Sequence, residues 1–144
     1  MTWPTPQPGL VIRYSYLWSR EAEAGRDEGL KDRPCAVVIS VRRGERDLVY
    51  VVPVTHSPPA SPDDAVELPA ATKARLGLDS ERSWIVVTEA NSFTWPGPDL
   101  RFVGDGGPAT SSYGMLPPAL YQTVRARFAA HVRAGRANVT RRTE

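Results

Sequence analysis

Two apolar stretches separated by a short polar segment decide the fold: KDRPCAVVIS at residues 31–40 and VVPVTH at residues 51–56. Both are rich in β-branched residues, which is typical of buried strands. The segment between them, residues 42–47, is polar and contains Gly44, as a hairpin connection does. Antiparallel pairing across this connection would bring the start of the first strand beside the end of the second.

This pairing would gather three chemically active side chains at one rim of a sheet. Arg33 opens the first strand, and Thr55 and His56 close the second. A guanidinium can bind two phosphate oxygens as a fork, while a hydroxyl positions a phosphate and an imidazole moves a proton. The pattern therefore predicts a phosphodiester site.

Further short strands are predicted on both sides of the hairpin. Residues 9–18 alternate apolar and polar side chains with period two, which indicates a half-buried strand. Residues 66–68 and 113–116 are shorter candidates, and residues 83–88 are expected to form a central strand.

Two helices are predicted from proline starts and apolar spacing. Pro69 opens a brief helix that ends near Leu76, just before Gly77. A longer C-terminal helix begins at Pro117-Pro118 and carries one apolar stripe with a spacing of four residues. The stripe consists of Leu120, Val124, Phe128 and Val132. Polar, proline-rich or glycine-rich loops are predicted at residues 19–32, 56–65 and 104–108.

Length and composition predict a single domain over residues 1–144, with an N-terminal extension at 1–8 and a flexible basic tail at 135–144. The 41% apolar content suffices for one core, while 14 prolines and 11 glycines indicate many turns and short strands. Together with the final helix, this predicts a mainly β (α+β) fold built on a small, highly curved sheet or barrel.

The single cysteine and the two histidines limit the chemistry. Cys35 stands alone, which excludes an intrachain disulfide, and its apolar surroundings indicate a buried structural thiol. His56 and His131 are far apart, so no metal-ligand pattern is present and no cofactor is expected. With no signal-peptide pattern and no membrane-length apolar run, we expect a cytoplasmic protein without membrane contact.

The net charge of +2 does not by itself indicate a nucleic-acid partner, but the C-terminal part of the chain is strongly basic. Its arginines are Arg125, Arg127, Arg133, Arg136, Arg141 and Arg142. This distribution is compatible with binding to a phosphate backbone, and equally with a solvated helix face and a frayed tail.

On these residues the chain resembles the PemK/MazF-type toxins, the ribosome-independent endoribonucleases of bacterial toxin–antitoxin pairs. The resemblance runs from Pro8-Gly9-Leu10-Val11-Ile12 through Asp32-Arg33-Pro34 and Pro53-Val54-Thr55 to the strand at 83–88 and the C-terminal helix. Two features depart from the family pattern: Leu10 stands where the family has an acid, and the segment from Glu89 to Tyr113 is longer than expected.

The resemblance implies an SH3-like barrel that acts as a homodimer and is inhibited by a cognate antitoxin protein. It also implies metal-independent cleavage of single-stranded RNA, such as mRNA, to a 2′,3′-cyclic phosphate and a 5′-hydroxyl. Arg33 and Thr55 match the catalytic Arg and Thr of the family. His56 is not carried over from the family and is a candidate general base only through its titration near neutral pH.

Four further residues are candidate RNA contacts. Lys31 precedes Arg33, and Glu89 and Asn91 follow the predicted strand at 83–88, where side chains of these types can read base edges. Trp95 can stack on an unpaired base.

Each candidate also has an ordinary structural interpretation. Arg33 could form a surface ion pair with Asp32 or Glu28, and Thr55 could be a plain strand-end hydroxyl. His56 could be exposed or anchor its loop. Asn91 could form a turn, and Trp95 could pack in the core.

Two other functions remain open from the sequence. One is a non-catalytic inhibitor on the same barrel, like the gyrase-poisoning toxins related to the family. The other is a module that binds nucleic acid or protein without turnover.

Overall fold

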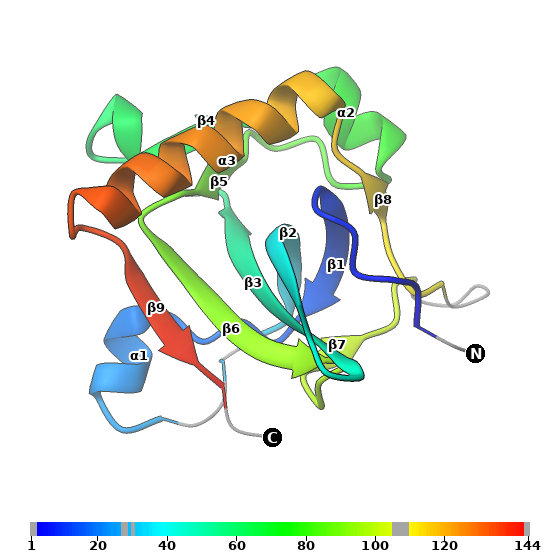
Figure 1. Ribbon diagram of the computed structural model, residues 1–144. Coiled ribbons are helices and arrows are strands. Elements are labelled where there is room, and N and C mark those ends of the chain that lie inside the picture. The colour runs from blue at the N-terminus through cyan, green and yellow to red at the C-terminus, as the bar shows by residue number, and fades with distance from the viewer. Residues whose placement is uncertain (1–2, 27–28, 30, 105–109, 143–144) are drawn as a thin grey trace.

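In the computed structural model, which describes residues 3–26, 29, 31–104 and 110–142, a long hairpin of β2 (Arg33–Arg43) and β3 (Arg46–Thr55) forms the middle of a mainly β fold (Figure 1). The ladder continues to the pair Arg43–Arg46, so only Gly44 and Glu45 connect the strands. Gly44 has φ +63°, a conformation that glycine adopts without steric cost. The predicted hairpin is confirmed, but its connection is shorter than residues 42–47 because polar residues extend both strands.

Nine strands of the described residues form one open sheet with β3 at its centre. Along one edge β3 pairs with β2, and along the other it pairs first with β6 and then with β5. Neighbouring strands are antiparallel, except that β9 runs parallel to β6. The remaining strands are β1 (Leu10–Tyr14), β4 (Ala65–Glu67), β5 (Trp84–Val86), β6 (Glu89–Trp95), β7 (Leu100–Arg101), β8 (Gly114–Met115) and β9 (Asn138–Arg141).

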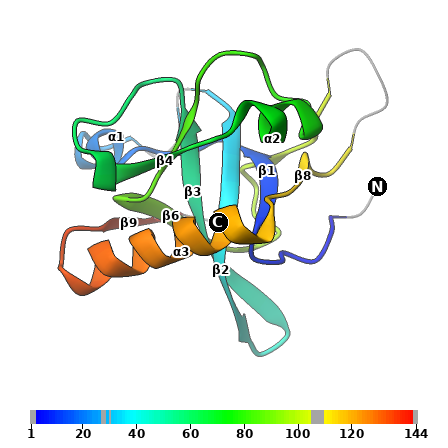
Figure 2. The same ribbon diagram turned by 90° about the horizontal axis from the view of Figure 1, so that it is seen from above.

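Helices cover one face of the sheet. The C-terminal helix α3 (Pro118–Arg133) lies across this face against β2 and β4, α2 (Ala70–Arg75) lies apart from α3, and α1 (Ser19–Glu23) lies beside β9 (Figures 1 and 2). A single 3-10 turn, Pro62–Asp64, precedes β4. None of the helices among the described residues has the length and apolar character needed to cross a membrane.

The core occupies both faces of β1, β2 and β3, which explains the apolar runs at residues 10–12, 34–39 and 48–54 within these strands. The cluster under α3 contains Val11, Val38, Val52, Val124 and Phe128, among others. The cluster on the opposite face contains Ile12, Tyr14, Val37, Val51 and Phe93, among others. Adjacent residues in each strand therefore enter opposite clusters, as the period of two requires. Cys35 is fully buried in the second cluster, and burial raises the pKa of its thiol, in agreement with a structural role.

The shorter predicted elements are confirmed, with differences in their bounds. Residues 66–68 correspond to β4, the brief helix after Pro69 to α2, and residues 113–116 to β8. The strand predicted at 9–18 ends at Tyr14, although Tyr16 still enters the same core cluster.

Three predictions about secondary structure are wrong. The loop at 19–32 contains helix α1, and the tail at 135–144, expected to be flexible, contains strand β9. The strand at 83–88 is only three residues long and lies beside the edge strand β4, because β3 takes the centre. Apart from Gly104, the loop predicted at 104–108 lies outside the described residues.

Near the C-terminal end of α3, the buried face of the helix departs from the predicted stripe with a spacing of four residues. Val124 and Phe128 are buried as expected, but Val132 is 49% exposed and His131 is 5% exposed. The Nε2 atom of His131 lies 2.8 Å from the backbone oxygen of Asp63. A helix turns by about 100° per residue, so the buried spacing 124, 128, 131 follows the helix more closely than a strict repeat of four.

Asn91 on β6 forms buried hydrogen bonds with Leu17 and Arg142, two residues far from it in the sequence. Its side chain is 0% exposed and donates to the backbone oxygen of Leu17 at 2.8 Å. Its Oδ1 accepts from the backbone N–H of Leu17 at 2.9 Å and from Nη1 of Arg142 at 3.1 Å. Asn91 is therefore a structural residue that joins the end of β1 and the end of β9 to the centre of the sheet.

Replacing Asn91 by alanine should lower the free energy of unfolding by about 2–4 kcal/mol, because buried polar groups of Leu17 and Arg142 would lose a partner. Urea unfolding followed by circular dichroism measures the change. Asn138→Ala at an exposed position of β9 is the matched control. Equal stabilities of the two variants would contradict the anchoring role of Asn91.

Candidate functional site

The open end of the β2–β3 hairpin forms a cleft. Cys35 pairs with Pro53, so Arg33 and Thr55, each two residues further out, lie across from one another at the ends of the two strands. Both residues line a cavity of about 220 Å³ together with Lys31 and His56. The structure thus brings together four residues that the sequence analysis singles out.

Arg33 is held at the edge of the cleft without an acidic partner among the described residues. Its Cζ lies 4.9 Å from the centre of the Trp18 ring, and its Nη1 donates to the backbone oxygen of Val54 at 3.1 Å. Its Nε is buried and finds no hydrogen-bond acceptor in the described part of the chain. A guanidinium carries five N–H donors, so Arg33 retains charge and donors for an anion in the cleft.

Asp32 does not neutralise Arg33. Its carboxylate oxygens lie 3.6 Å from Nε of Arg13 and 3.7 Å from Nε of Arg101. Glu28, the other acid considered as a partner, lies outside the described residues.

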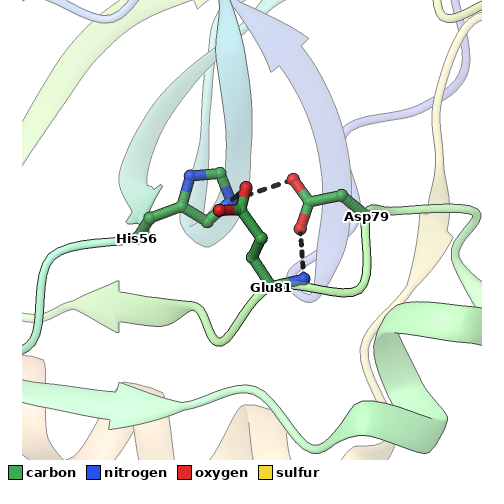
Figure 3. A group of neighbouring side chains, drawn as sticks. All are labelled: His56, Asp79 and Glu81. Atoms are coloured by element: carbon green, nitrogen blue, oxygen red, sulfur yellow. Dashed lines mark hydrogen bonds and ion pairs between the residues drawn. The ribbon is translucent and has the colours of Figure 1, made fainter.

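His56 is oriented by carboxylates from a loop that the sequence analysis did not connect with it. Its Nε2 lies 2.9 Å from Oδ2 of Asp79 and 3.6 Å from Oε2 of Glu81 (Figure 3). Hydrogen bonds from Lys73 and then from His56 hold the pKa of the Asp79 carboxyl below its usual value. An ionised carboxylate only accepts hydrogen bonds, so Nε2 of His56 carries the ring proton and donates a hydrogen bond to Asp79. In the neutral ring Nδ1, which points away from both carboxylates, is then the basic nitrogen (Figure 3).

Lys73 of α2 fixes Asp79 from the other side. Its side chain is almost fully buried and its Nζ lies 2.6 Å from both Oδ1 of Asp79 and Oγ of Ser83. It also donates to the backbone oxygen of Glu81. Nothing in the sequence distinguishes this lysine from a solvated helical one, because its partners lie in a loop whose path only the fold determines.

Thr55 stands where the cleft meets a second hollow. Its Oγ1 accepts from the backbone N–H of Ser57 at 3.2 Å, which leaves the hydroxyl proton for another acceptor. The neighbouring hollow has a volume of about 260 Å³ and is lined by Trp18, Arg20 and Pro58 among others. Thr55 therefore lines both hollows, and an extended ligand can run past it from one hollow into the other.

The three candidates on β6 do not reach the cleft. Asn91 is buried and fully engaged, and it lies in a strand and not in a turn. Trp95 is 7% exposed and its Nε1 donates to the backbone oxygen of Pro4 at 2.9 Å. Glu89 accepts from the hydroxyl of Tyr16 at 3.0 Å and from the backbone N–H of Ser19 at 2.9 Å. Strand β6 turns Asn91 and Trp95 into the core, so in this geometry their side chains are not exposed to a bound RNA, and their role as RNA contacts stays a prediction.

Burial raises the pKa of the Glu89 carboxyl, which makes stability depend on pH. A raised pKa means that the folded state binds the proton more tightly than the unfolded state. The free energy of unfolding should therefore decrease as the pH rises from the unfolded to the folded pKa, and the loss should persist at higher pH.

Glu89→Gln removes this titration while keeping an oxygen that accepts from Tyr16 and Ser19. The stability of the variant relative to the unmodified protein should increase between pH 4 and pH 7, as measured by urea unfolding. Glu23→Gln, at an exposed position of α1, corrects for the loss of one negative charge. A difference that is flat or decreases with pH would contradict this account.

Among the described residues, His56, Asp79 and Glu81 also form a group of side chains whose ligand atoms could meet on a metal ion. Their ligand atoms lie within 4.8 Å of one another, on exposed side chains. One oxygen of Asp79 already accepts from the Lys73 ammonium, which opposes a cation at the same carboxylate. The hydrogen bonds of His56 and Lys73 account for this cluster without an ion.

Compared with models of known protein families and with the sequences of characterised proteins, the chain matches none. The chemistry of the cleft is therefore judged from its residues. It combines an anion-binding guanidinium, a hydroxyl and an imidazole whose proton position is fixed by a carboxylate.

Proposed function

We propose that the chain is a metal-independent endoribonuclease that cleaves single-stranded RNA in the cleft of Arg33, Thr55 and His56. One observation carries the proposal: the guanidinium of Arg33, without an acidic partner among the described residues, lines the same cavity as an imidazole held by the Asp79 carboxylate. These are the groups that phosphodiester transfer to a neighbouring ribose hydroxyl requires.

The proposed reaction begins with the removal of the 2′-hydroxyl proton by Nδ1 of His56. The 2′-oxygen forms a bond to phosphorus and the bond from phosphorus to the 5′-oxygen breaks, while the departing oxygen takes a proton from solvent. The products are a 2′,3′-cyclic phosphate and a 5′-hydroxyl. Arg33 stabilises the negative charge on the non-bridging oxygens, and Thr55 donates a hydrogen bond to one of them.

Asp79 and Lys73 are positioning residues in this proposal. The Asp79 carboxylate fixes the ring of His56 and stabilises the imidazolium that forms when the 2′-proton is taken. Lys73 holds the carboxylate in place from the buried side.

We further propose, from the Asp32-Arg33-Pro34 and Pro53-Val54-Thr55 motifs, that the chain is the toxin of a PemK/MazF-type pair. This proposal includes an SH3-like barrel, a homodimer, a cognate antitoxin and a cytoplasmic location. The mainly β fold with a C-terminal helix on one face supports it. A small neighbouring gene whose product binds and inhibits the chain would be the expected antitoxin.

The requirement for a 2′-hydroxyl tests the proposal directly. An all-ribose oligonucleotide should be cleaved, and the same sequence with 2′-deoxyribose at every position should bind but remain intact. Cleavage of the deoxyribose strand would overturn the proposed chemistry. If both oligonucleotides bind and neither is cleaved, the protein is a non-catalytic inhibitor or a binding module instead.

A further inference from the structure

A larger hollow lies at the other end of the hairpin, near its turn. It has a volume of about 560 Å³ and is lined by three arginines and three hydroxyl-bearing residues. These residues are Arg43, Arg46, Arg141, Tyr50, Ser92 and Thr94, which we call the arginine pocket. Arg33 and Arg43 lie at opposite ends of β2, about 30 Å apart along the strand, and the two hollows share no lining residue, so the arginine pocket is a separate site.

The three arginines of the pocket are exposed, and none of their guanidinium groups has a hydrogen bond or ion pair among the described residues. Two acids, Glu45 and Asp47, also line the pocket. Asp47 is already engaged, because its Oδ2 lies 3.4 Å from Nη1 of Arg42. The pocket therefore keeps an excess of positive charge that its own acids do not neutralise.

The three arginines lie on three different strands: Arg43 on β2, Arg46 on β3 and Arg141 on β9. Tyr50 on β3 pairs with Ser92 on β6, and Ser92 pairs with Arg141 on β9, so the three form a row across the sheet. Arg46 lies four residues before Tyr50, or about 13 Å along β3, and β9 lies two strand spacings, about 10 Å, from β3. Backbone positions this far apart match successive phosphates along an extended nucleic-acid strand.

We propose that the arginine pocket binds the phosphate backbone of a single-stranded nucleic acid. Guanidinium groups and hydroxyls are the usual donors to backbone phosphates, and such contacts carry no sequence preference. The hairpin that carries Arg43 and Arg46 protrudes from the body of the protein, so a strand can lie against it (Figure 2). Binding at the arginine pocket does not require cleavage in the distant cleft.

Fluorescence anisotropy with a labelled oligodeoxythymidylate of about 12 nucleotides tests the proposal, since sites for single strands span roughly 4–16 nucleotides. This probe lacks the 2′-hydroxyl and stays intact. The triple variant R43A/R46A/R141A should bind at least about ten-fold more weakly. The slope of log K against log salt should become less steep by about 2, or roughly 0.7 for each lost phosphate contact.

The matched control is R125A/R133A/R136A, which removes the same charge from exposed positions outside the pocket. It should keep the slope of the unmodified protein, and circular dichroism confirms that both triple variants are folded. An equal loss in both variants, no loss in the pocket variant, or no binding by the unmodified protein would overturn the proposal. Tighter binding of a duplex of the same length would overturn the choice of a single strand.

The outcomes for the two sites are distinguishable. Binding through the pocket by a protein that cleaves no RNA would support the pocket and remove the proposed function. RNA cleavage with unchanged DNA binding in R43A/R46A/R141A would remove the pocket and leave the proposed function in place.

Discussion

Replacing Arg33 by alanine should lower kcat/KM for RNA cleavage by about 10²–10³, which corresponds to about 2.7–4 kcal/mol of transition-state stabilisation. Arg33 lines the cleft without an acidic partner among the described residues, and its ring contact with Trp18 holds the guanidinium in place. Alanine removes both the charge and the donors that, in the proposed reaction, bind the phosphoryl oxygens. The measurement is the initial rate of cleavage of a fluorescent RNA.

Two further variants separate the role of the Arg33 guanidinium from the loss of a positive charge alone. Arg33→Lys should recover only part of the activity, since an ammonium cannot bind two oxygens as a planar fork. Arg82→Ala removes a positive charge from an exposed side chain that pairs with Glu67 outside the cleft, and it should leave the rate nearly unchanged. A folded Arg33→Ala protein with normal activity would exclude Arg33 from the reaction.

The second large effect is expected at His56. Replacing it by alanine should lower kcat/KM by about 10²–10⁴, the range for loss of a general acid or base. The increase of kcat/KM with pH that a general base produces should also disappear, because no group in the variant takes up the 2′-hydroxyl proton in its place. The pH profile of initial rates measures both effects.

Glutamine at position 56 separates catalysis from anchoring. Its amide can still donate a hydrogen bond to Asp79, but it has no basic nitrogen. If His56 only anchors its loop, His56→Gln should be nearly as active as the unmodified protein. If His56 is the base, His56→Gln should be as inactive as His56→Ala, and this is the result we expect.

The hairpin and its rim were predictable because the signals are local. Apolar stretches rich in β-branched residues at 31–40 and 51–56 identify the strands, and the polar turn between them sets which ends meet. The positions of Arg33 and Thr55 follow from that pairing alone. No contact with a distant part of the chain is needed to place them.

The rest of the site depends on contacts between segments far apart in the sequence. Asp79 reaches His56 only because β5, which follows Asp79 in the chain, pairs with the end of β3. Lys73 is indistinguishable in sequence from a solvated lysine until the loop at 79–83 surrounds it. Such partners follow from the tertiary fold and not from any local pattern.

Strands β6 and β9 were missed for a related reason. β6 places the polar residues Asn91 and Ser92 in buried positions, so its sequence lacks the alternation of a half-buried strand. The amide of Asn91 is satisfied by Leu17 and Arg142, both distant in the chain. β9 is polar and basic, and it forms a strand only because it pairs with β6.

Cleavage of a long unstructured RNA in the presence of EDTA, with analysis of both new ends, tests the central claim most directly. We expect the unmodified protein to cleave the RNA to 2′,3′-cyclic phosphate and 5′-hydroxyl ends, and Arg33→Ala to cleave almost none. Ends carrying a 5′-phosphate, or cleavage that appears only when a divalent metal is added, would contradict it.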